Sequence, residues 1–347
     1  LDWGLLPHLG RSPEYRMNKA VFLGEAACKL LELKLGWLET DDKDHYGNKV
    51  IKFAGQMIAD LFRTAIRNMV RDMKYQLERM GQRRGIGAVG AAIRPGIITD
   101  RLSNAIATGN WGRGKVGVTQ LLDRTNYLST LSHLRRIQSP LSRSQPNYEA
   151  RDLHGTHFGR ICPNETPEGS NCGLVKNLAL SAVISVSVPE AEIMDRLLEL
   201  GVKPVSEASE ELKRGGCKIF IEGHFAGYVE NGEYFVTAFR KLRRQGLINS
   251  NVSIYLYKPK DERGTNRVYI STSSGRVMRP LIIVKDRKPL LTNGMMTQIS
   301  KGELTWRDLL KEGIIELIDA NEEENCFVAM DLDSLTDKHT HLEPSTS

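Results

Sequence analysis

The stretch LHGTHFGRICPNETPEGSNCGLVKN, residues 153–177, decides how the chain is interpreted. Its prolines and glycines fix turns, so it forms a rigid loop around Glu165, Glu168 and Asn171. The two glutamates either stabilise these turns or make a functional contact. The run 174–188 that continues it is apolar and becomes β-branched toward its end, which predicts a buried strand.

Helical patterns precede this stretch. Apolar residues recur at helical spacing over residues 21–35, and Gly36 is a stop signal, so we expect a helix there. A longer amphipathic helix is predicted over 57–80, and its apolar stripe is typical of core packing. From 81 to 117 nine glycines break the pattern and leave helical potential only at 101–107.

A second α+β unit is predicted beyond residue 189. Residues 191–200 have the pattern of a helix, and residues 238–245 that of a basic helix. Short alternating runs separated by turn residues predict strands at 218–222, 225–230, 234–237, 252–257, 268–272 and 277–284. Beyond Lys311 the chain turns acidic. The fold class is therefore α+β, in a chain of several domains with short antiparallel strands.

Composition excludes several classes of protein. The chain has 347 residues, 40% of them apolar, which suits a folded protein of two or three domains and argues against disorder. No apolar run approaches the roughly 20 residues that span a bilayer, and no signal-peptide pattern occurs, so we expect a cytoplasmic protein without a membrane partner. The chain begins without Met and ends in a polar tail, which indicates a piece of something longer.

Positive charge is concentrated in one part of the chain. The net charge is +6, but residues 79–160 alone hold 13 Lys and Arg against 4 Asp and Glu. A basic, glycine-rich stretch of this kind suits a polyanion such as nucleic acid. A solvated basic surface gives the same count, so both interpretations stay open on charge alone.

Metal and catalytic chemistry find weak support. The five cysteines include no Cys-x-x-Cys pair, which indicates reduced thiols, and the spacing of Cys162 and Cys172 with two nearby histidines fits no standard zinc module. The acidic run at 41–44 is either a magnesium-binding cluster or a turn capped by aspartates, and its interleaved lysine favours the turn. No phosphate-binding loop or nucleophile elbow occurs, so we assign this chain no catalytic residue and no metal site.

Residues 153–177 closely resemble the fork region of the second-largest, β-type subunit of multisubunit DNA-directed RNA polymerases. Other blocks resemble the same family, in its archaeal-type version. They are DDKDHYGNK at 41–49, ATGNWG at 107–112, the segment 126–136, GRVMRPL at 275–281 and IDANEEE at 318–324. Nearly the whole chain is covered by this resemblance.

The resemblance implies a layout in three parts, within the central to C-terminal part of the N-terminal half of that subunit (B''). Residues 1–80 would be the end of the lobe and protrusion, with the long amphipathic helix. Residues 81–188 would be the fork, with its loops and a pocket on the RNA side, and 189–347 the external domain with its acidic C-terminal segment. The block 339–343 resembles the start of the hybrid-binding region, and some archaea encode this subunit as two polypeptides that divide near this point.

The resemblance also assigns nucleic-acid-binding residues, which line the path of the RNA–DNA hybrid or contact phosphates: Gln120, Asp123, His133, Arg135, Arg136, Arg143 and Asn171. A planar guanidinium suits phosphate oxygens, although ion pairs within the domain are the alternative for the first two arginines. Two fork loops are expected at 109–118 and 138–145. Residues 120–136 resemble the pocket beside the nascent RNA where rifamycins bind in bacterial enzymes. Tyr127 and Leu134 stand where the bacterial sequences have Pro and Lys, so we expect weak or no rifamycin binding.

In this family the magnesium-chelating aspartates lie on the largest subunit. The resemblance therefore implies that the chain binds no cofactor itself and is inactive alone. As part of a nucleotidyltransferase that uses Mg²⁺, it would position template DNA, nascent RNA and the edges of the melted region. Its implied partners are the largest subunit, the remaining part of the second-largest subunit and the other polymerase subunits.

Two other hypotheses remain open at this point. The chain could be a stand-alone nucleic-acid-binding module, which would be closed and well packed without a large exposed apolar patch. It could also be a magnesium-dependent nuclease that uses Asp41, Asp42 and Asp44.

Overall fold

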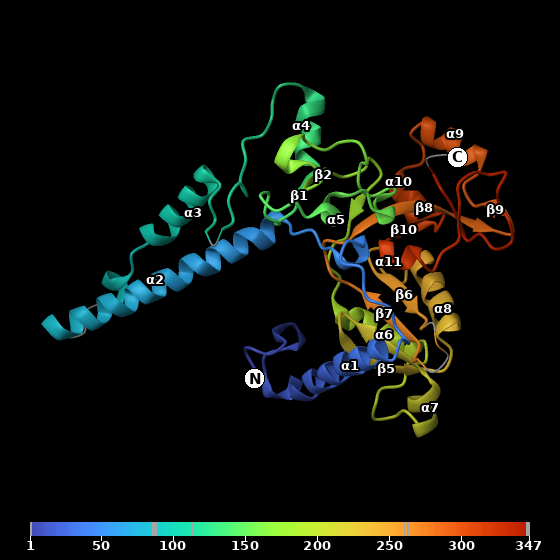
Figure 1. Cartoon of the computed structure of the whole chain (residues 1–347), viewed down its shortest axis with the longest axis horizontal. Helices are drawn as coiled ribbons and strands as arrows, with labels where there is room; N and C mark the ends of the chain where they lie inside the picture. Colours follow the sequence, from blue (N-terminus) through green and yellow to red (C-terminus); the bar gives the residue numbers. More distant parts are fainter. Residues whose placement is uncertain (1, 85–88, 113, 260, 262–263, 345–347) are drawn as a thin grey trace. The chain divides into compact units, whose positions relative to one another are not determined.

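A computed structural model describes residues 2–84, 89–112, 114–259, 261 and 264–344. The chain forms two compact units, each assembled from segments that are distant in sequence (Figure 1). Unit 1 comprises residues 1–51, 152–164 and 179–347, and unit 2 comprises 52–151 and 165–178. The expected three-part division stays a prediction, while the α+β fold class with mixed sheets is confirmed.

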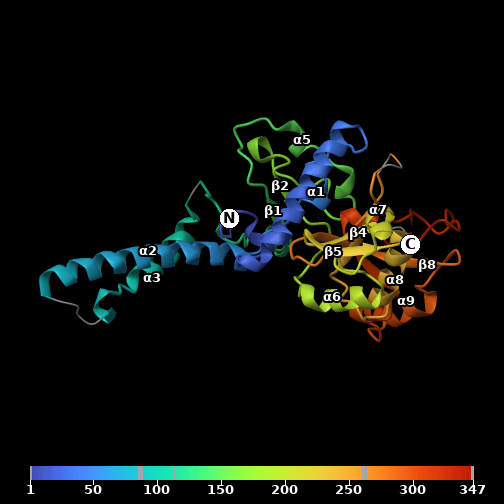
Figure 2. The same ribbon diagram turned by 90° about the horizontal axis from the view of Figure 1, so that it is seen from below.

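Unit 2 contains two long helices that pack together, α2 (Ala54–Arg84) and α3 (Gly96–Thr108) (Figures 1 and 2). The predicted helix at 57–80 is confirmed, but its apolar stripe is only partly packed. Leu61 and Ala65 are buried, whereas Ile58, Phe62 and Val70 are each more than 40% exposed. The remaining elements of unit 2 are short: η4 (Val89–Ala92), α4 (Tyr127–Leu134), β1 (Arg136–Gln138), α5 (Tyr148–Arg151), η6 (Gly169–Asn171) and β2 (Val175–Asn177).

Unit 1 contains a four-stranded sheet of order β5-β4-β7-β6. Its strands are β4 (Cys217–Ile221), β5 (His224–Val229), β6 (Ser253–Tyr257) and β7 (Arg267–Ser271). The strands β4 and β7 are parallel, and the other two pairings are antiparallel. Apolar side chains from one face form a buried core with α6 (Glu190–Glu199) and α8 (Gly232–Arg244). The helix α1 (Arg16–Lys34) contacts β5, and the short α7 (Glu210–Gly215) also lies beside that strand (Figure 1).

Two of the predicted strands are wrong. Residues 234–237 belong to α8, because the Asn231 side chain caps the helix by accepting hydrogen bonds from the backbone N–H groups of residues 233 and 234. Phe235 and Phe239 then share one buried helix face. The run 174–188 holds two short strands, β2 and β3 (Val183–Ile184), which lie in different units.

A second sheet of unit 1 is built around the long buried strand β8 (Val277–Lys285). The antiparallel partners of β8 are β3, β9 (Lys288–Pro289), β10 (Ile315–Ile318) and β12 (His341–Leu342). The strand β11 (Val328–Ala329) extends the sheet beyond β12. Apolar residues of this sheet pack with α9 (Asn293–Ser300) and α10 (Trp306–Lys311), which lie close to β8 and β10. Three single turns of 3-10 helix near the chain start and one in residues 153–177, the fork motif, complete the unit: η1 (Pro7–Leu9), η2 (Pro13–Tyr15), η3 (Tyr46–Asn48) and η5 (Gly155–His157).

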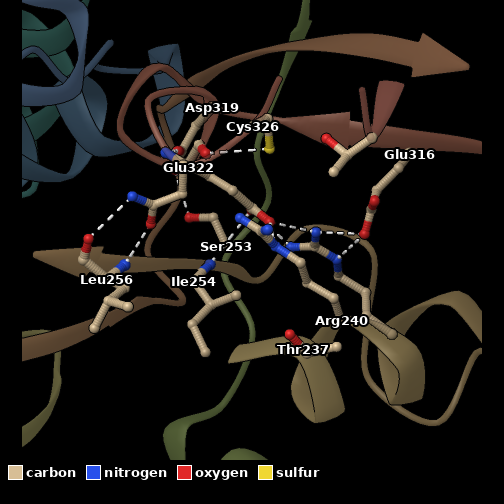
Figure 3. Close-up of polar contacts among 12 residues, drawn as sticks. Thr237, Arg240, Ser253, Ile254, Leu256, Glu316, Asp319, Glu322 and Cys326 are labelled. Carbon is tan, nitrogen blue, oxygen red and sulfur yellow. Dashed lines mark hydrogen bonds and ion pairs between the residues drawn. The ribbon is translucent and has the colours of Figure 1, made fainter. Parts of the chain in front are cut away.

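Buried ion pairs join the two sheets of unit 1 at the short helix α11 (Ala320–Glu323) (Figure 3). Arg243 of α8 is fully buried and donates to Glu322 at 2.6 Å and 2.8 Å, to Glu316 of β10 at 2.5 Å and 3.0 Å, and to the Val252 carbonyl at 2.7 Å. Arg240 donates to the same Glu322 at 2.9 Å. Glu322 of the acidic block IDANEEE is thus buried in ion pairs with arginines of α8 and is not exposed to solvent.

Two further carboxylates of this block hold other segments. Asp319 accepts from Arg276 at 2.9 Å, and Glu323 accepts from Arg160 of the fork motif at 2.5 Å and from Arg279. Burial raises the pKa of Asp319 and of Glu323, but the facing arginines outweigh it and leave both pKa values below the usual range. Both groups are therefore ionised in the folded protein.

Candidate nucleic-acid interface

The helix α4 carries or adjoins most of the residues that we expect to bind nucleic acid. The Asn126 side chain caps its first turn and accepts from the Ser129 backbone N–H at 2.7 Å. The Asp123 carboxylate accepts from Thr125 N at 2.9 Å, from Thr125 Oγ1 at 2.7 Å and from Ser129 Oγ. These hydrogen bonds, that from Ser129 foremost, lower the pKa of Asp123 to about 2.

Three of the predicted residues form one hydrogen-bonded chain. His133 Nδ1 accepts from the Asp123 backbone N–H at 3.0 Å, so its Nε2 carries the proton of the neutral ring and donates to Gln120 Oε1 at 3.0 Å. The Gln120 amide in turn donates to Gln138 Oε1 at 3.2 Å and to the Gly117 carbonyl at 3.0 Å. The structure therefore brings Gln120, Asp123 and His133 together and fixes the orientation of each.

The fork motif is attached directly to this network. Strands β1 and β2 pair antiparallel, with Arg136 opposite Asn177, and Ser132 of α4 donates to the Glu165 carboxylate. The Glu165 carboxylate thus connects the fork motif to α4, which supports a structural role for this glutamate. Arg136 is exposed on the edge of this pair.

Three other predicted residues of unit 2 lie in the loop after β1, at the end of α4 and in η6. Arg143 is exposed in the loop that follows β1, and Arg135 is half-buried at the C-terminal end of α4. Asn171 is half-buried in η6, where its Oδ1 has no hydrogen-bond partner among the described residues.

Two basic residues of unit 2 escaped sequence reasoning. Arg151 donates to the carbonyls of Gln145 and Pro146 at 3.4 and 2.9 Å and to those of Ser170 and Cys172 at 2.9 and 2.6 Å, so it ties the end of the expected second fork loop to the fork motif. Only its position between two loops could have indicated this role. Arg124 is exposed directly beside Asp123, and no motif of the family resemblance assigns a role to this position.

The expected first fork loop is shaped by glycines. Gly109, Gly112, Gly114 and Gly117 all have positive φ, and a Cβ on Gly109 would lie 2.6 Å from the Thr119 carbonyl oxygen. Trp111 closes the loop, because its indole N–H donates to Thr119 Oγ1 at 2.9 Å. Residue 113 of this loop lies outside the described residues.

The acidic run at 41–44 is a turn in unit 1. Asp42 accepts from the Asp44 backbone N–H at 2.8 Å and from His154 Nε2 at 2.7 Å, which together lower the pKa of Asp42. Asp44 accepts from Lys49 at 3.0 Å. Among the residues that the structure describes, no group of three or more His, Cys, Asp and Glu side chains is arranged to hold a metal ion. Asp42 and Asp44 are thus engaged in contacts within this turn and with His154 and Lys49.

Comparison with protein families supports the resemblance to RNA polymerase subunits. Four models of consecutive Rpb2 domains match the chain in order: RNA polymerase Rpb2 domain 2 at residues 3–52, domain 3 at 120–184, domain 4 at 219–285 and domain 5 at 306–346. The chain belongs to the family of second-largest RNA polymerase subunits.

Proteins similar to this chain include archaeal and eukaryotic polymerase subunits. DNA-directed RNA polymerase subunit Rpo2 of Saccharolobus shibatae is 47% identical over 99% of this chain and 31% of its own length. DNA-directed RNA polymerase subunit Rpo2N of Methanothermobacter thermautotrophicus is 53% identical over 58% of this chain and 39% of its own length. DNA-directed RNA polymerase II subunit RPB2 of Encephalitozoon cuniculi is 35% identical over 96% of this chain and 29% of its own length. The chain thus spans about a third of the relatives that it matches.

Every one of the 11 α-helices in the described part of the chain is too short or too polar to cross a membrane. All five cysteines are free thiols.

Proposed function

We propose that the chain is the part of a DNA-directed RNA polymerase's second-largest subunit that positions template DNA, nascent RNA and the edges of the melted region. The ordered match to four Rpb2 domains carries this proposal. Unit 2 supports it with a prearranged polar network next to exposed arginines. In this assignment the network residues orient the hybrid, and Arg136 and Arg143 contact phosphates without regard to sequence.

The layout of this function follows the expected division of the chain. Residues 1–80 would be the end of the lobe and protrusion, 81–188 the fork, and 189–347 the external domain. The fork loops at 109–118 and 138–145 would border the hybrid and the downstream edge of the melted region. Glycines with positive φ shape the backbone of the first loop, and hydrogen bonds from Arg151 hold the end of the second loop in place.

The catalytic magnesium ions would be held by the largest subunit, as membership of this family implies, and in this chain Asp42 and Asp44 are engaged in a turn and in contacts with His154 and Lys49. This chain would then contribute binding and orientation to nucleotide addition, and would be inactive alone. Its partners would be the largest subunit, the remainder of the second-largest subunit and the other polymerase subunits, in the cytoplasm.

A stand-alone binding module is less compatible with the surface of unit 2. Leu121, Tyr127, Leu128 and Leu134 are between 67% and 96% exposed around α4, and α4 has no buried residue. A closed module would cover such side chains, whereas a subunit leaves them for its neighbours.

Affinity purification of the chain from its native cells tests the proposal. We expect it to bring down, in equal amounts, a largest-subunit homologue that carries the catalytic aspartates. A monodisperse chain that binds nucleic acid but never co-purifies with that homologue would establish the stand-alone module instead.

A further inference from the structure

The side chain of Arg151, at the C-terminal end of α5, lies between two segments that carry expected nucleic-acid-binding residues. Its half-buried guanidinium has five N–H groups, and it makes five hydrogen bonds, all of them to backbone carbonyls. Three of the carbonyls belong to the end of the second fork loop and the residue after it, and two belong to the residues on either side of Asn171. One side chain thus binds both segments.

The guanidinium contacts the fork motif more closely than it contacts the loop. Nη1 donates to the carbonyls of Ser170 and Cys172 at 2.9 and 2.6 Å, and Nε donates to that of Pro146 at 2.9 Å. Nη2 donates to the carbonyls of Arg143 and Gln145, both at 3.4 Å. Because the donors of a guanidinium lie in one rigid plane, this group can serve two segments at once, whereas a lysine ammonium has only three donors on a flexible stem.

The start of the same loop is attached to the fork motif separately. The Ser139 backbone N–H donates to the Leu174 carbonyl at 2.8 Å, directly after the pairing of β1 with β2. Both ends of the loop at 138–145 are therefore fastened to the fork motif, and the exposed Arg143 lies between them. Since the Arg143 carbonyl accepts from Arg151, this contact sets where the backbone of Arg143 lies relative to Asn171.

We propose that Arg151 is a positioning residue for nucleic-acid binding. It holds the backbone of Arg143 at a fixed place relative to Asn171, so that the contact at the edge of the melted region keeps a constant spacing from the path of the hybrid. All five N–H groups of Arg151 are engaged with carbonyls, so it acts through Arg143 and not by contacting a phosphate itself. Since Arg143 is assigned to phosphate only in the proposed function, the role of Arg151 rests on that function.

A double-mutant cycle in the assembled polymerase tests this role. Arg151→Lys keeps the charge but loses the planar set of donors, and Arg143→Ala removes the side chain that Arg151 positions. We expect each variant to shorten the lifetime of transcription complexes about fivefold or more and to make the salt slope shallower by roughly one unit. The double variant should lie within about twofold of the more severe single variant, because both changes remove the same contact.

Arg136→Ala provides the matched control. Arg136 is also assigned to phosphate, but its strand β1 is held by β2, so the effects of Arg151→Lys and Arg136→Ala should multiply. A lifetime unchanged by Arg151→Lys, or effects of Arg151→Lys and Arg143→Ala that multiply, would overturn the positioning role while the proposed function stands. A lifetime unchanged by Arg143→Ala alone would refute the phosphate contact of Arg143, and the role of Arg151 with it.

Trypsin cleavage of the isolated chain covers the case in which Arg151→Lys disturbs the whole of unit 2. We expect cleavage after Arg143 to become at least about fivefold faster, because the end of the loop is released, and cleavage after the exposed Arg124 to stay unchanged. Faster cleavage at both sites would show a general loss of structure and would contradict a positioning role. Cleavage after Arg143 at the parental rate would contradict it as well.

Discussion

Arg243 gives the sharpest test of what holds unit 1 together. The substitution Arg243→Met keeps much of the side-chain volume but removes all its hydrogen bonds to Glu316, Glu322 and the Val252 carbonyl. Arg244 and the buried His341 remain beside Glu316, and Arg240 remains beside Glu322, yet both carboxylates lose the buried arginine that bridges them. Breaking a buried pair in this way costs about 3–5 kcal/mol.

The cost is measurable as a shift in thermal unfolding. For a unit of this size about 1 kcal/mol shifts the midpoint by roughly 2–4 °C, so we expect a fall of about 6–20 °C. Fluorescence in a Trp111→Phe background reports on unit 1 alone, because the three remaining tryptophans lie there.

Two matched variants separate the ion pair from other effects. Arg196→Met removes an exposed pair with Glu199 and should shift the midpoint very little. Arg243→Lys keeps the positive charge but loses the forked set of donors, so it should lose less stability than Arg243→Met. An Arg243→Met midpoint within about 2 °C of the parent, which is below 1 kcal/mol, would refute the role of this cluster.

Three further predictions concern pH, backbone and activity. The pKa values of Glu316, Asp319 and Glu323 are lowered in the folded protein, so their ionised forms stabilise unit 1 at neutral pH, and this stabilisation is lost as the pH falls through the folded pKa values. Burial lowers the pKa of His341 below 6.5, so protonation of this side chain at low pH also favours the unfolded state. Unfolding midpoints should therefore fall first below about pH 6.5, where the contribution of His341 is lost, and again below about pH 4, where those of the carboxylates are lost; a profile that stays flat from about pH 4 down to about pH 3 would count against the pairing. Gly173→Ala should destabilise unit 2 more than Gly169→Ala, because both have φ of +70° but only a Cβ at residue 173 meets backbone, the Arg151 carbonyl oxygen at 2.4 Å; equal unfolding midpoints would contradict this. The isolated chain should neither extend RNA on a template nor cleave nucleic acid with Mg²⁺, and either activity in the pure chain would disprove its dependence on partner subunits.

The fold was predictable where a pattern is local. The spacing of apolar residues located α1, α2 and all four strands of the four-stranded sheet, because helix and strand periods are properties of neighbouring residues. The start of α8 was missed because Tyr234 and Phe235 favour strands by composition, whereas the cap at Asn231 starts a helix. The buried pairs of Arg243 were invisible, since their partners lie more than 70 residues away.

The candidate site was predictable only through its resemblance to a family. The network of Gln120 and His133 depends on how the segment before α4 folds back onto that helix, and the position of Arg136 depends on how β1 pairs with the distant strand β2, so neither follows from composition. The same dependence explains why Arg151 was overlooked. The partners of Arg151 are backbone carbonyls of two loops, and since every residue has a carbonyl, the sequence does not show which of them Arg151 contacts.

The lifetime of assembled transcription complexes tests the central claim most directly. Polymerase carrying Arg136→Ala and Arg143→Ala is compared, over a range of salt concentrations, with polymerase carrying Arg196→Ala on unit 1. We expect shorter lifetimes for the double variant and a salt slope shallower by roughly one unit per lost phosphate contact. Lifetimes and slopes identical to those of the Arg196→Ala control would contradict the assignment of unit 2 to nucleic-acid binding.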